Sequence, residues 1–313
     1  MINVVVKRGR AKPLWRRHPW VFRDSIAKID GEPQPGDLVC VQDASGRPIG
    51  WGFYSPDSKI SVRILEREDP TRVEDGLFVE RLAKAVALRT ETLALPIVTD
   101  AYRVVHAEGD GLPGLVVDSF AGHLVAQFST AGMARRKDQL LDALEEVLSP
   151  KTIHESVDRR ACDEEGLRPK PGLRRGTLPP SPPSVLEHGV CFRVGLGAGQ
   201  KTGFFADQRD NRQLIGRLVR DREVLDLHTY TGGFGLHAAV NGADQVLGID
   251  SSGPALALAV ENAMLNHGRQ VRYERADARK ALDDLHRRGR TFDVVISDPP
   301  RLAPTRGAVP KAL

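Results

Sequence analysis

A glycine-rich turn after an apolar segment is the part of this sequence whose residues most directly indicate chemistry. Residues 223–228 (EVLDLH) predict a buried strand, and a turn containing Gly232, Gly233 and Gly235 follows it where a helical pattern begins. Glycine lets the backbone approach a ligand closely, and doubly wound sheets bind ligands at the carboxyl ends of their strands. Taken alone, the segment fits either a dinucleotide fingerprint or a tight turn. Its spacing is not GxGxxG, which argues against a dehydrogenase.

Acidic residues accompany three predicted strands. Asp226 lies within the strand before the turn, where its carboxylate is placed to meet the amino-acid part of a ligand. Asp250 ends the second strand about 20 residues after the turn, where an acid accepts hydrogen bonds from ribose hydroxyls. Asp277 ends the third strand and is placed to accept from an adenine amino group. For Asp250 and Asp277 the alternative is a helix N-cap, which the residues alone leave open.

The fourth predicted strand ends in Ser297-Asp298-Pro299-Pro300-Arg301. Paired prolines fix φ and remove backbone donors. We therefore expect a rigid loop beside the ligand site, with backbone carbonyls directed at a substrate. Four features of this kind at four successive strand ends are hard to obtain by chance.

A polar segment with phenylalanines precedes these strands, at residues 199–212 (GQKTGFFADQRDNR). Its mixture of Gly, Phe, Gln and Arg is not typical of a core strand. We predict a lid in which Phe205 covers the adenine and Gln208 binds the amino acid. The alternative is a loop that caps a helix starting near Asp207.

Together these residues resemble the PUA-domain class I S-adenosylmethionine (SAM)-dependent methyltransferases that modify large-subunit ribosomal RNA, whose closest members methylate carbon 5 of a cytosine. The residues 108–118 (EGDGLPGLVVD), Glu165-Gly-Leu, GQKTGFF with DQR-NR, YTGGF and DPP carry the resemblance, which covers nearly the whole chain. It implies SAM as methyl donor and RNA, specifically large-subunit rRNA, as acceptor. The implied cofactor-binding residues are Phe205, Gln208, Asp226, Tyr230, Thr231, Gly232, Gly233, Phe234, Asp250, Asp277 and Asp298. Asp298, Pro299 and Pro300 are the implied catalytic residues, which orient a flipped-out base.

Two departures from the family shape what we expect of this chain. It ends at Leu313, soon after DPP, whereas the family continues with further strands and helices. Carbon 5 of a pyrimidine becomes nucleophilic only after a thiolate adds to carbon 6, and the family's cysteine lies in that later part. We therefore assign no nucleophile among Cys40, Cys162 and Cys191, and expect a C-terminally truncated member. The alternative is an RNA- and SAM-binding fragment without activity; an amino-methyltransferase ranks lower, because Arg301 replaces the aromatic residue that usually follows the prolines.

Composition and charge agree with an RNA-binding protein of the cytoplasm. The 313 residues are 41% hydrophobic, and the three cysteines form no CxxC pair, so we predict no metal site and a reducing compartment. We see no signal peptide and no membrane span. The net charge is +4, and basic residues concentrate at the N-terminus with Trp15, Trp20 and Phe22 among them. The predicted RNA contacts are Lys7, Arg8, Arg10, Lys12, Arg16 and Arg17; the alternative is a solvated face beside buried aromatics.

The elements that would position these residues predict an α/β fold in three domains. We expect a β-rich PUA-like RNA-binding domain over residues 1–70, a middle α/β domain over 71–185, and an incomplete Rossmann-like SAM domain over 186–313. Residues 168–184, rich in Pro, Gly and Arg, are predicted to be a linker without regular structure. In the last domain, strands alternate with helices, which indicates parallel βαβ units. Only four of its strands are readable, so one sheet edge should be open, and a homodimer is possible.

Overall fold

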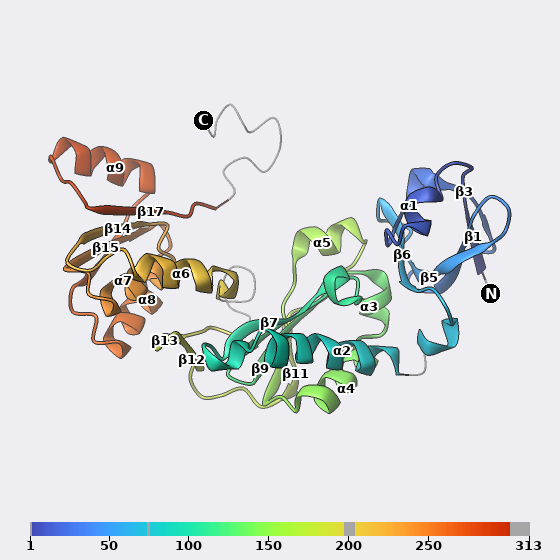
Figure 1. The fold of residues 1–313 in the computed structure, drawn as a ribbon, viewed down its shortest axis with the longest axis horizontal. Helices are drawn as coiled ribbons and strands as arrows, with labels where there is room; N and C mark the ends of the chain where they lie inside the picture. Colours follow the sequence, from blue (N-terminus) through green and yellow to red (C-terminus); the bar gives the residue numbers. More distant parts are fainter. Residues whose placement is uncertain (1, 74–75, 197–203, 301–313) are drawn as a thin grey trace. The chain divides into compact units, whose positions relative to one another are not determined.

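The computed structural model describes residues 2–73, 76–196 and 204–300. The chain forms two compact units (Figure 1), one of residues 1–181 with 195–204 and one of residues 182–194 with 205–313. The division into three domains that the sequence predicts stays a prediction.

The first unit begins with a six-stranded sheet of mixed direction. Its strand order is β2 (Trp20–Phe22), β6 (Ile60–Glu66), β5 (Pro48–Tyr54), β4 (Leu38–Gln42), β1 (Ile2–Val6) and β3 (Ile26–Asp30). Only β1 and β4 pair in parallel. Valines 4, 6, 39, 41 and 62 are buried in its core, and the short helix α1 (Lys12–Trp15) contributes Leu14. Apolar segments at residues 4–6, 37–42, 48–54 and 60–65 predict four of these strands, and the structure confirms them as β1, β4, β5 and β6. Strand β2 was missed because it has only three residues, and β3 because Lys28 and Asp30 interrupt its apolar pattern.

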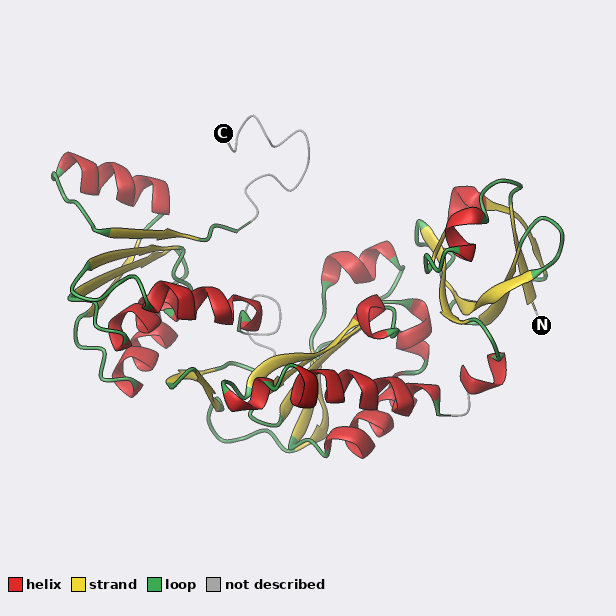
Figure 2. Ribbon diagram, in the orientation of Figure 1, coloured by secondary structure: helices red, strands yellow, loops and turns green. Residues whose placement is uncertain are grey.

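A five-stranded sheet with helices forms the rest of the first unit (Figure 2). Its strand order is β11 (Gly172–Gly176), β10 (Thr152–Glu155), β9 (His123–Phe128), β8 (Leu115–Phe120) and β7 (Ala101–His106). The helices are α2 (Leu77–Ala87), α3 (Ala131–Arg135), α4 (Lys137–Leu148) and α5 (Arg159–Glu164). Helix α2 packs against α4 through the buried side chains Leu82, Leu140 and Leu144.

Two predictions for this part were wrong. The alternation of apolar and charged residues from Phe78 to Leu93 predicts one amphipathic helix, but α2 ends at Ala87 and a single π-helical turn follows at Leu88–Thr92. The segment 168–184, expected to lack regular structure, contains strand β11, which pairs antiparallel with β10. Pairing and ion pairs from Arg174 to Glu155 and from Arg175 to Glu145 hold this strand. Such long-range partners leave no periodicity in the sequence.

The second unit is a parallel sheet of four strands with helices on both faces. Its strand order is β16 (Val271–Arg275), β15 (Gln245–Asp250), β14 (Glu223–Leu227) and β17 (Val294–Ser297). The helices are α6 (Arg209–Gly216), α7 (Gly233–Val240), α8 (Gly253–Leu265) and α9 (Ala278–Arg287). The chain moves outward from β14 to β16 and then crosses to the opposite side of β14. This reversal makes the carboxyl end of β14 a topological switch point, where doubly wound sheets bind ligands.

A hairpin precedes this sheet and belongs to the second unit. It consists of β12 (Ser184–Glu187) and β13 (Val190–Arg193), which pair antiparallel. Asn262 of α8 and Asn266, the C-cap of that helix, bond to the hairpin backbone. Asn262 Oδ1 accepts from Arg193 N, and Asn266 accepts from Cys191 N while donating to Cys191 O. The hairpin was not predicted, because its strands are short and its partners lie about 70 residues away.

Candidate SAM site

The loop after β14 is fixed to the end of β15. The backbone N–H of Tyr230 donates to Asp250 Oδ2 at 2.9 Å, and Thr229 N donates to the carbonyl of Ile249 at 3.0 Å. Tyr230 has φ +51° and its neighbour His228 φ +58°, a region that non-glycine residues rarely occupy. Such strain persists only where the surroundings enforce it, and it clusters at functional sites. The conformation of the turn is therefore fixed by its surroundings.

Gly232 is required by two independent constraints. Its φ of +85° favours glycine, and a Cβ at this position would overlap the Tyr273 hydroxyl. Tyr273 comes from β16 and packs beneath the turn, where burial raises the pKa of its phenol. Among the described residues, its hydroxyl has no hydrogen-bond partner. The sequence analysis missed Tyr273, which carries no motif and is recognisable only by its place in the sheet.

Asp226 shapes the turn from inside the sheet. Its side chain is 1% exposed, and its Oδ2 accepts from Thr229 Oγ1 at 2.5 Å and from Gly235 N at 2.9 Å. Burial outweighs these bonds and raises the pKa of the carboxyl to about 6. The structure thus gives Asp226 a supporting position, and its contact with the amino-acid end of a ligand stays a prediction.

Asp277 is the N-cap of a helix, as the alternative interpretation predicted, but Asp250 is not. The N-cap of α8 is Ser252, whose side chain accepts from Ala255 N, whereas Asp250 is half-buried at the strand end. Each Asp250 oxygen accepts one backbone N–H, which leaves lone pairs for ribose hydroxyls. Asp277 does cap its helix, since its Oδ1 accepts from Lys280 N at 3.1 Å. The ligand contacts of both acids remain predictions.

The structure brings the predicted lid residues to the turn and to the fourth strand. The Phe205 ring meets the Tyr230 ring edge-on at 5.3 Å between centroids. Gln208 Nε2 donates to Asp298 Oδ2 at 3.0 Å, although the two residues are 90 positions apart. Phe205 and Gln208 precede α6, so the predicted helix start near Asp207 is also present, as a 3-10 turn at Ala206–Gln208. The preceding residues 199–203 lie outside the described part of the chain.

The remaining predicted residues lie around the same strand ends. Asp298, Pro299 and Pro300 are exposed, as expected for a loop that faces a substrate; Arg301 lies outside the described residues. Thr231 is buried, and its carbonyl accepts from Asn262 Nδ2 at 3.1 Å. Phe234 is half-buried and packs against the core under α7, which gives its side chain a structural partner. Gly233 begins α7 and lies against the side chain of Arg212.

These residues fit SAM by the chemistry of their donors. The missing side chains of Gly232 and Gly233 let the turn pack closely on Tyr273 and Arg212, which fixes its backbone at the end of β14. The half-buried carboxylate of Asp250 is suited to hydroxyl donors, and the aromatic rings of Phe205 and Tyr230 offer faces for a purine. When bound, SAM would supply an electrophilic methyl group.

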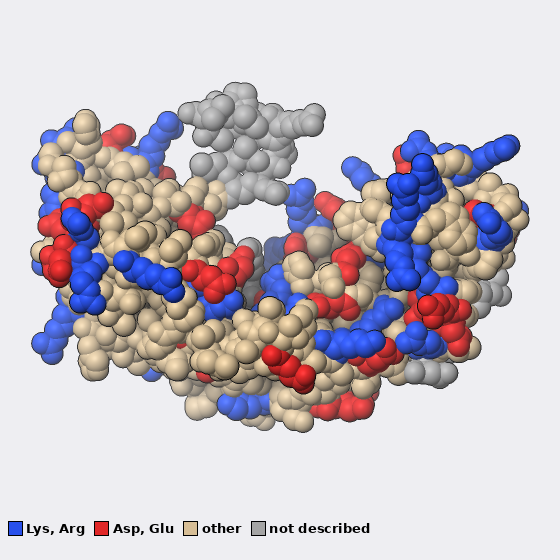
Figure 3. Space-filling model, in the orientation of Figure 1, with Lys and Arg blue, Asp and Glu red and all other residues tan. Residues whose placement is uncertain are grey.

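The predicted RNA-binding cations are all exposed on the N-terminal module, where Lys and Arg side chains gather (Figure 3). Trp15 is 46% exposed and lies beneath the Arg47 guanidinium, and Phe22 is 41% exposed. Trp20, in contrast, is half-buried, and its indole donates to Glu108 Oε1 at 2.9 Å. Trp20 is therefore a structural residue, and Trp15 and Phe22 are the aromatics available for stacking. Their contact with RNA stays a prediction.

Two of the motifs that carry the family resemblance, EGDGLPGLVVD at residues 108–118 and Glu165-Gly-Leu, each contribute a glutamate that contacts the six-stranded sheet. Glu108 accepts from Trp20 and lies 3.6 Å from Arg63 Nε, and Glu165 lies 2.8 Å from the Nη1 of the same arginine. Arg63 and Glu165 are largely buried, with side chains 13% and 3% exposed. The ion pairs and the indole bond hold β2 and β6 against the middle sheet, a role that the sequence did not reveal.

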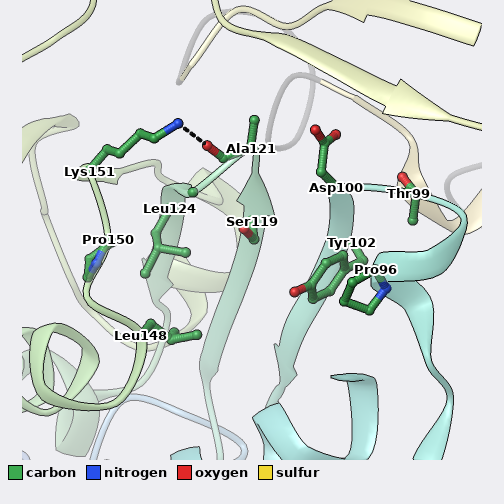
Figure 4. Close-up of a pocket in the computed structure, with 11 residues that line it drawn as sticks. Pro96, Thr99, Asp100, Tyr102, Ser119, Ala121, Leu124, Leu148, Pro150 and Lys151 are labelled. Atoms are coloured by element: carbon green, nitrogen blue, oxygen red, sulfur yellow. Dashed lines mark hydrogen bonds between the residues drawn. The ribbon is translucent and has the colours of Figure 1, made fainter. Parts of the chain in front are cut away.

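A pocket of about 440 Å³ opens in the middle sheet, outside the predicted site (Figure 4). Tyr102, Ser119 and Leu124 line it from the strands, and Asp100 and Lys151 stand at its ends. Lys151 Nζ donates to the carbonyl of Ala121 at 2.9 Å. The sequence analysis did not anticipate this pocket.

The three cysteines lie in different environments in the structure. Cys40 and Cys162 are buried in the first unit, and burial raises the pKa of both thiols. Cys191 is half-buried in β13. Within residues 2–73, 76–196 and 204–300, no cluster of three or more His, Cys, Asp or Glu has the arrangement of a metal site. No helix in that part of the chain is both long and apolar enough to cross a membrane.

The strand order and parallel pairing define a doubly wound domain with a topological switch point at the end of β14. Comparison with known families agrees: a PUA-like domain profile matches residues 4–67, and a profile described as S-adenosylmethionine-dependent methyltransferase matches residues 113–309. The chain belongs to this family of S-adenosylmethionine-dependent methyltransferases and carries a PUA-like domain before it.

Individual relatives extend over most of the chain. The ribosomal RNA large subunit methyltransferase I of Tolumonas auensis is 38% identical over 96% of this chain and 76% of its own length. The enzyme of that name from Shewanella denitrificans is 39% identical, over 96% and 77%. A structure described as a SAM-dependent methyltransferase from Streptococcus mutans has a TM-score of 0.79 at 21% identity, over 96% of this chain and 77% of that one. A methyltransferase structure complexed with S-adenosylhomocysteine (SAH) has a TM-score of 0.81 at 21% identity, over 98% and 78%.

Proposed function

We propose that this protein transfers the methyl group of SAM to large-subunit ribosomal RNA, at carbon 5 of a cytosine. The observation that supports the rRNA acceptor best is the identity of 38–39%, over 96% of the chain, with relatives named as rRNA large subunit methyltransferases. The exposed cations of the N-terminal module add an electrostatic reason, since Lys and Arg on one face attract phosphates. A cytoplasmic location and a homodimer stay predictions.

The site supports transfer to a base taken out of its stack. We propose that Asp298 and the Pro299-Pro300 backbone orient this base, because they are exposed at the end of β17 beside Gln208. Asp250 and the Gly232-Gly233 turn would hold the cofactor. In the transfer, the bond from sulfur to methyl breaks as the bond from methyl to carbon 5 forms.

Carbon 5 needs activation, which the two buried cysteines of the first unit are poorly suited to supply. A thiolate adds to carbon 6, and after methyl transfer a base removes the proton from carbon 5 and the thiolate leaves. Cys40 and Cys162 are buried with raised thiol pKa, so both are poor thiolate sources at neutral pH. We therefore place the target cytosine and the cofactor, and we assign neither the nucleophile nor the proton acceptor.

The deciding experiment is methyl transfer from labelled SAM to unmodified large-subunit rRNA by the 313-residue chain, followed by nucleoside analysis. Label in 5-methylcytosine is the expected result. Label in another nucleoside would keep the methyltransferase and reject cytosine-5. If folded protein binds both SAH and RNA but incorporates no label, the proposed methyl transfer is wrong. The protein would then be one that binds both ligands without catalysing the reaction.

A further inference from the structure

A buried carboxylate outside the predicted site joins the elements that form it. Glu187 lies at the end of β12, is 0% exposed, and uses both oxygens. Oε1 accepts from Arg212 Nε and Oε2 from Arg212 Nη2, each at 2.7 Å. His237 Nε2 lies 3.1 Å from Oε1. Burial alone raises the pKa of Glu187, but the bonds from His237 and Arg212 outweigh burial and lower it to about 2.

The two partners lead to the two sides of the SAM site. Arg212, on α6, also donates from Nη2 to the carbonyl of Phe205 at 3.0 Å, so it fixes the segment that carries Phe205 and Gln208. Its side chain also lies against Gly233, where an added Cβ would come within 3.1 Å of Arg212 Cδ. His237 lies on α7, one turn after the glycine-rich loop, and stacks on Phe192 of the hairpin.

From these contacts we infer that Glu187 is a positioning residue for SAM binding. It holds the Phe205–Gln208 segment and the start of α7 in one fixed relation through Arg212 and His237. The carboxylate touches neither cofactor nor substrate. Glu187→Gln would remove the charge to which Arg212 and His237 are bonded, and both partners would have to rearrange. The inference rests on the proposed placement of SAM beside Tyr230 and Asp250.

The test compares Glu187→Gln with Glu155→Gln by calorimetric titration of the full chain with SAH. Glu155 is a matched control in the first unit: it is 1% exposed and bound by Lys137 and Arg174. We expect Glu187→Gln to raise the Kd for SAH about tenfold or more, because a misplacement of about 1 Å in the groups that hold a ligand costs up to about 100-fold. Glu155→Gln should leave the Kd within about twofold of the wild-type value, since it perturbs stability but not the site.

Stoichiometry separates positioning from simple instability. A merely structural role would lower the number of SAH sites per chain, because part of the protein is unfolded, and leave the Kd of the folded part unchanged. A wild-type Kd for folded Glu187→Gln, or equal losses in both variants, would overturn the inference. If Glu187→Gln does not fold, Arg212→Lys gives the same test, since lysine keeps the charge but lacks the planar fork that bonds both oxygens of Glu187 and the carbonyl of Phe205. A wild-type Kd for this variant overturns the inference.

Asp250→Ala distinguishes failure of the inference from failure of the site. If Asp250→Ala weakens SAH binding and Glu187→Gln does not, the positioning inference is wrong and the site stands. If neither variant weakens it, the SAM site itself has been misplaced, and the inference falls with it.

Discussion

The carboxylate of Asp226 shows how one buried residue can support the turn of a candidate ligand site. It lies inside the sheet, and its oxygen gathers the Thr229 hydroxyl and the Gly235 N–H, so the two ends of the turn are held by a single atom. Burial removes water from the carboxylate and disfavours its charged form, which raises the pKa of Asp226 to about 6.

Asp226 predicts a specific pH dependence of stability. Its folded pKa of about 6 lies above the ordinary value of 3.8, so between these values the folded state binds a proton that the unfolded state has released. The contribution of Asp226 to the free energy of unfolding is therefore fully present below about pH 4 and is lost as pH rises to about 6. The loss is on the order of 3 kcal/mol.

Denaturant unfolding of wild type and Asp226→Asn between pH 4 and 7 measures this effect. We expect the stability of the wild type relative to the variant to fall across that range, because asparagine does not titrate. A difference that stays constant with pH would show that Asp226 ionises normally in the folded protein.

Helix α8 is the element that completes the hairpin. The outer edge of β13 pairs with no strand among the described residues, and Asn262 and Asn266 bond to its backbone instead. Buried or half-buried backbone groups must be paired, so these amides determine where the hairpin can dock. The docked hairpin in turn brings Glu187 to α6 and α7.

Asn266→Ala should loosen the hairpin locally. The variant leaves both the N–H and the carbonyl of Cys191 without their side-chain partner. We expect a loss of about 1–2 kcal/mol in the free energy of unfolding and faster hydrogen exchange at the Cys191 amide.

Asn3→Ala provides the control for that measurement. Asn3 is also half-buried and accepts from Gln42 Nε2, but it lies in the first unit. Exchange at Cys191 should not change in this variant. Equal acceleration in both variants would refute the local role of Asn266.

On the scale of the whole molecule, charge is distributed by module rather than uniformly. The net charge is only +4, yet the N-terminal segment carries its cations exposed, together with the exposed aromatics Trp15 and Phe22. If RNA binds there, affinity should depend on salt in proportion to the phosphates neutralised.

Replacing Arg8, Arg10, Arg16 and Arg17 by Ala should weaken RNA binding while SAH binding stays unchanged. The slope of log K against log salt should become shallower by about 3, from roughly 0.7–0.9 per lost phosphate contact. Fluorescence anisotropy with an rRNA fragment at several salt concentrations measures it.

Removing four exposed cations of α9 and its C-cap provides a control with the same change in net charge. The control residues are Arg279, Lys280, Arg287 and Arg288. Their loss should alter the slope much less. If it alters the slope equally, binding follows total charge, and the N-terminal face has no special role.

Local patterns in the sequence predicted much of the fold and named the candidate ligand site. The sequence patterns predict a helix over Lys137–Leu148 and a strand over Gln245–Asp250, and α4 and β15 have these bounds, because amphipathic or apolar periodicity reflects burial directly. The strand-end acids and the glycine turn were recognisable because ligand sites in parallel sheets lie at strand ends, which are consecutive features along the chain.

The tertiary structure alone decided which of these residues are supports and which remain accessible. The residues Glu187, Tyr273 and Asn262 carry no motif, and their positions follow from contacts between segments far apart in sequence. Likewise, whether Asp226 faces ligand or core, and whether Asp250 or Ser252 caps α8, depends on burial and on which N–H lies within reach. Periodicity and spacing record which face of an element is buried. They do not record which partner meets it, because packing between distant segments determines that partner.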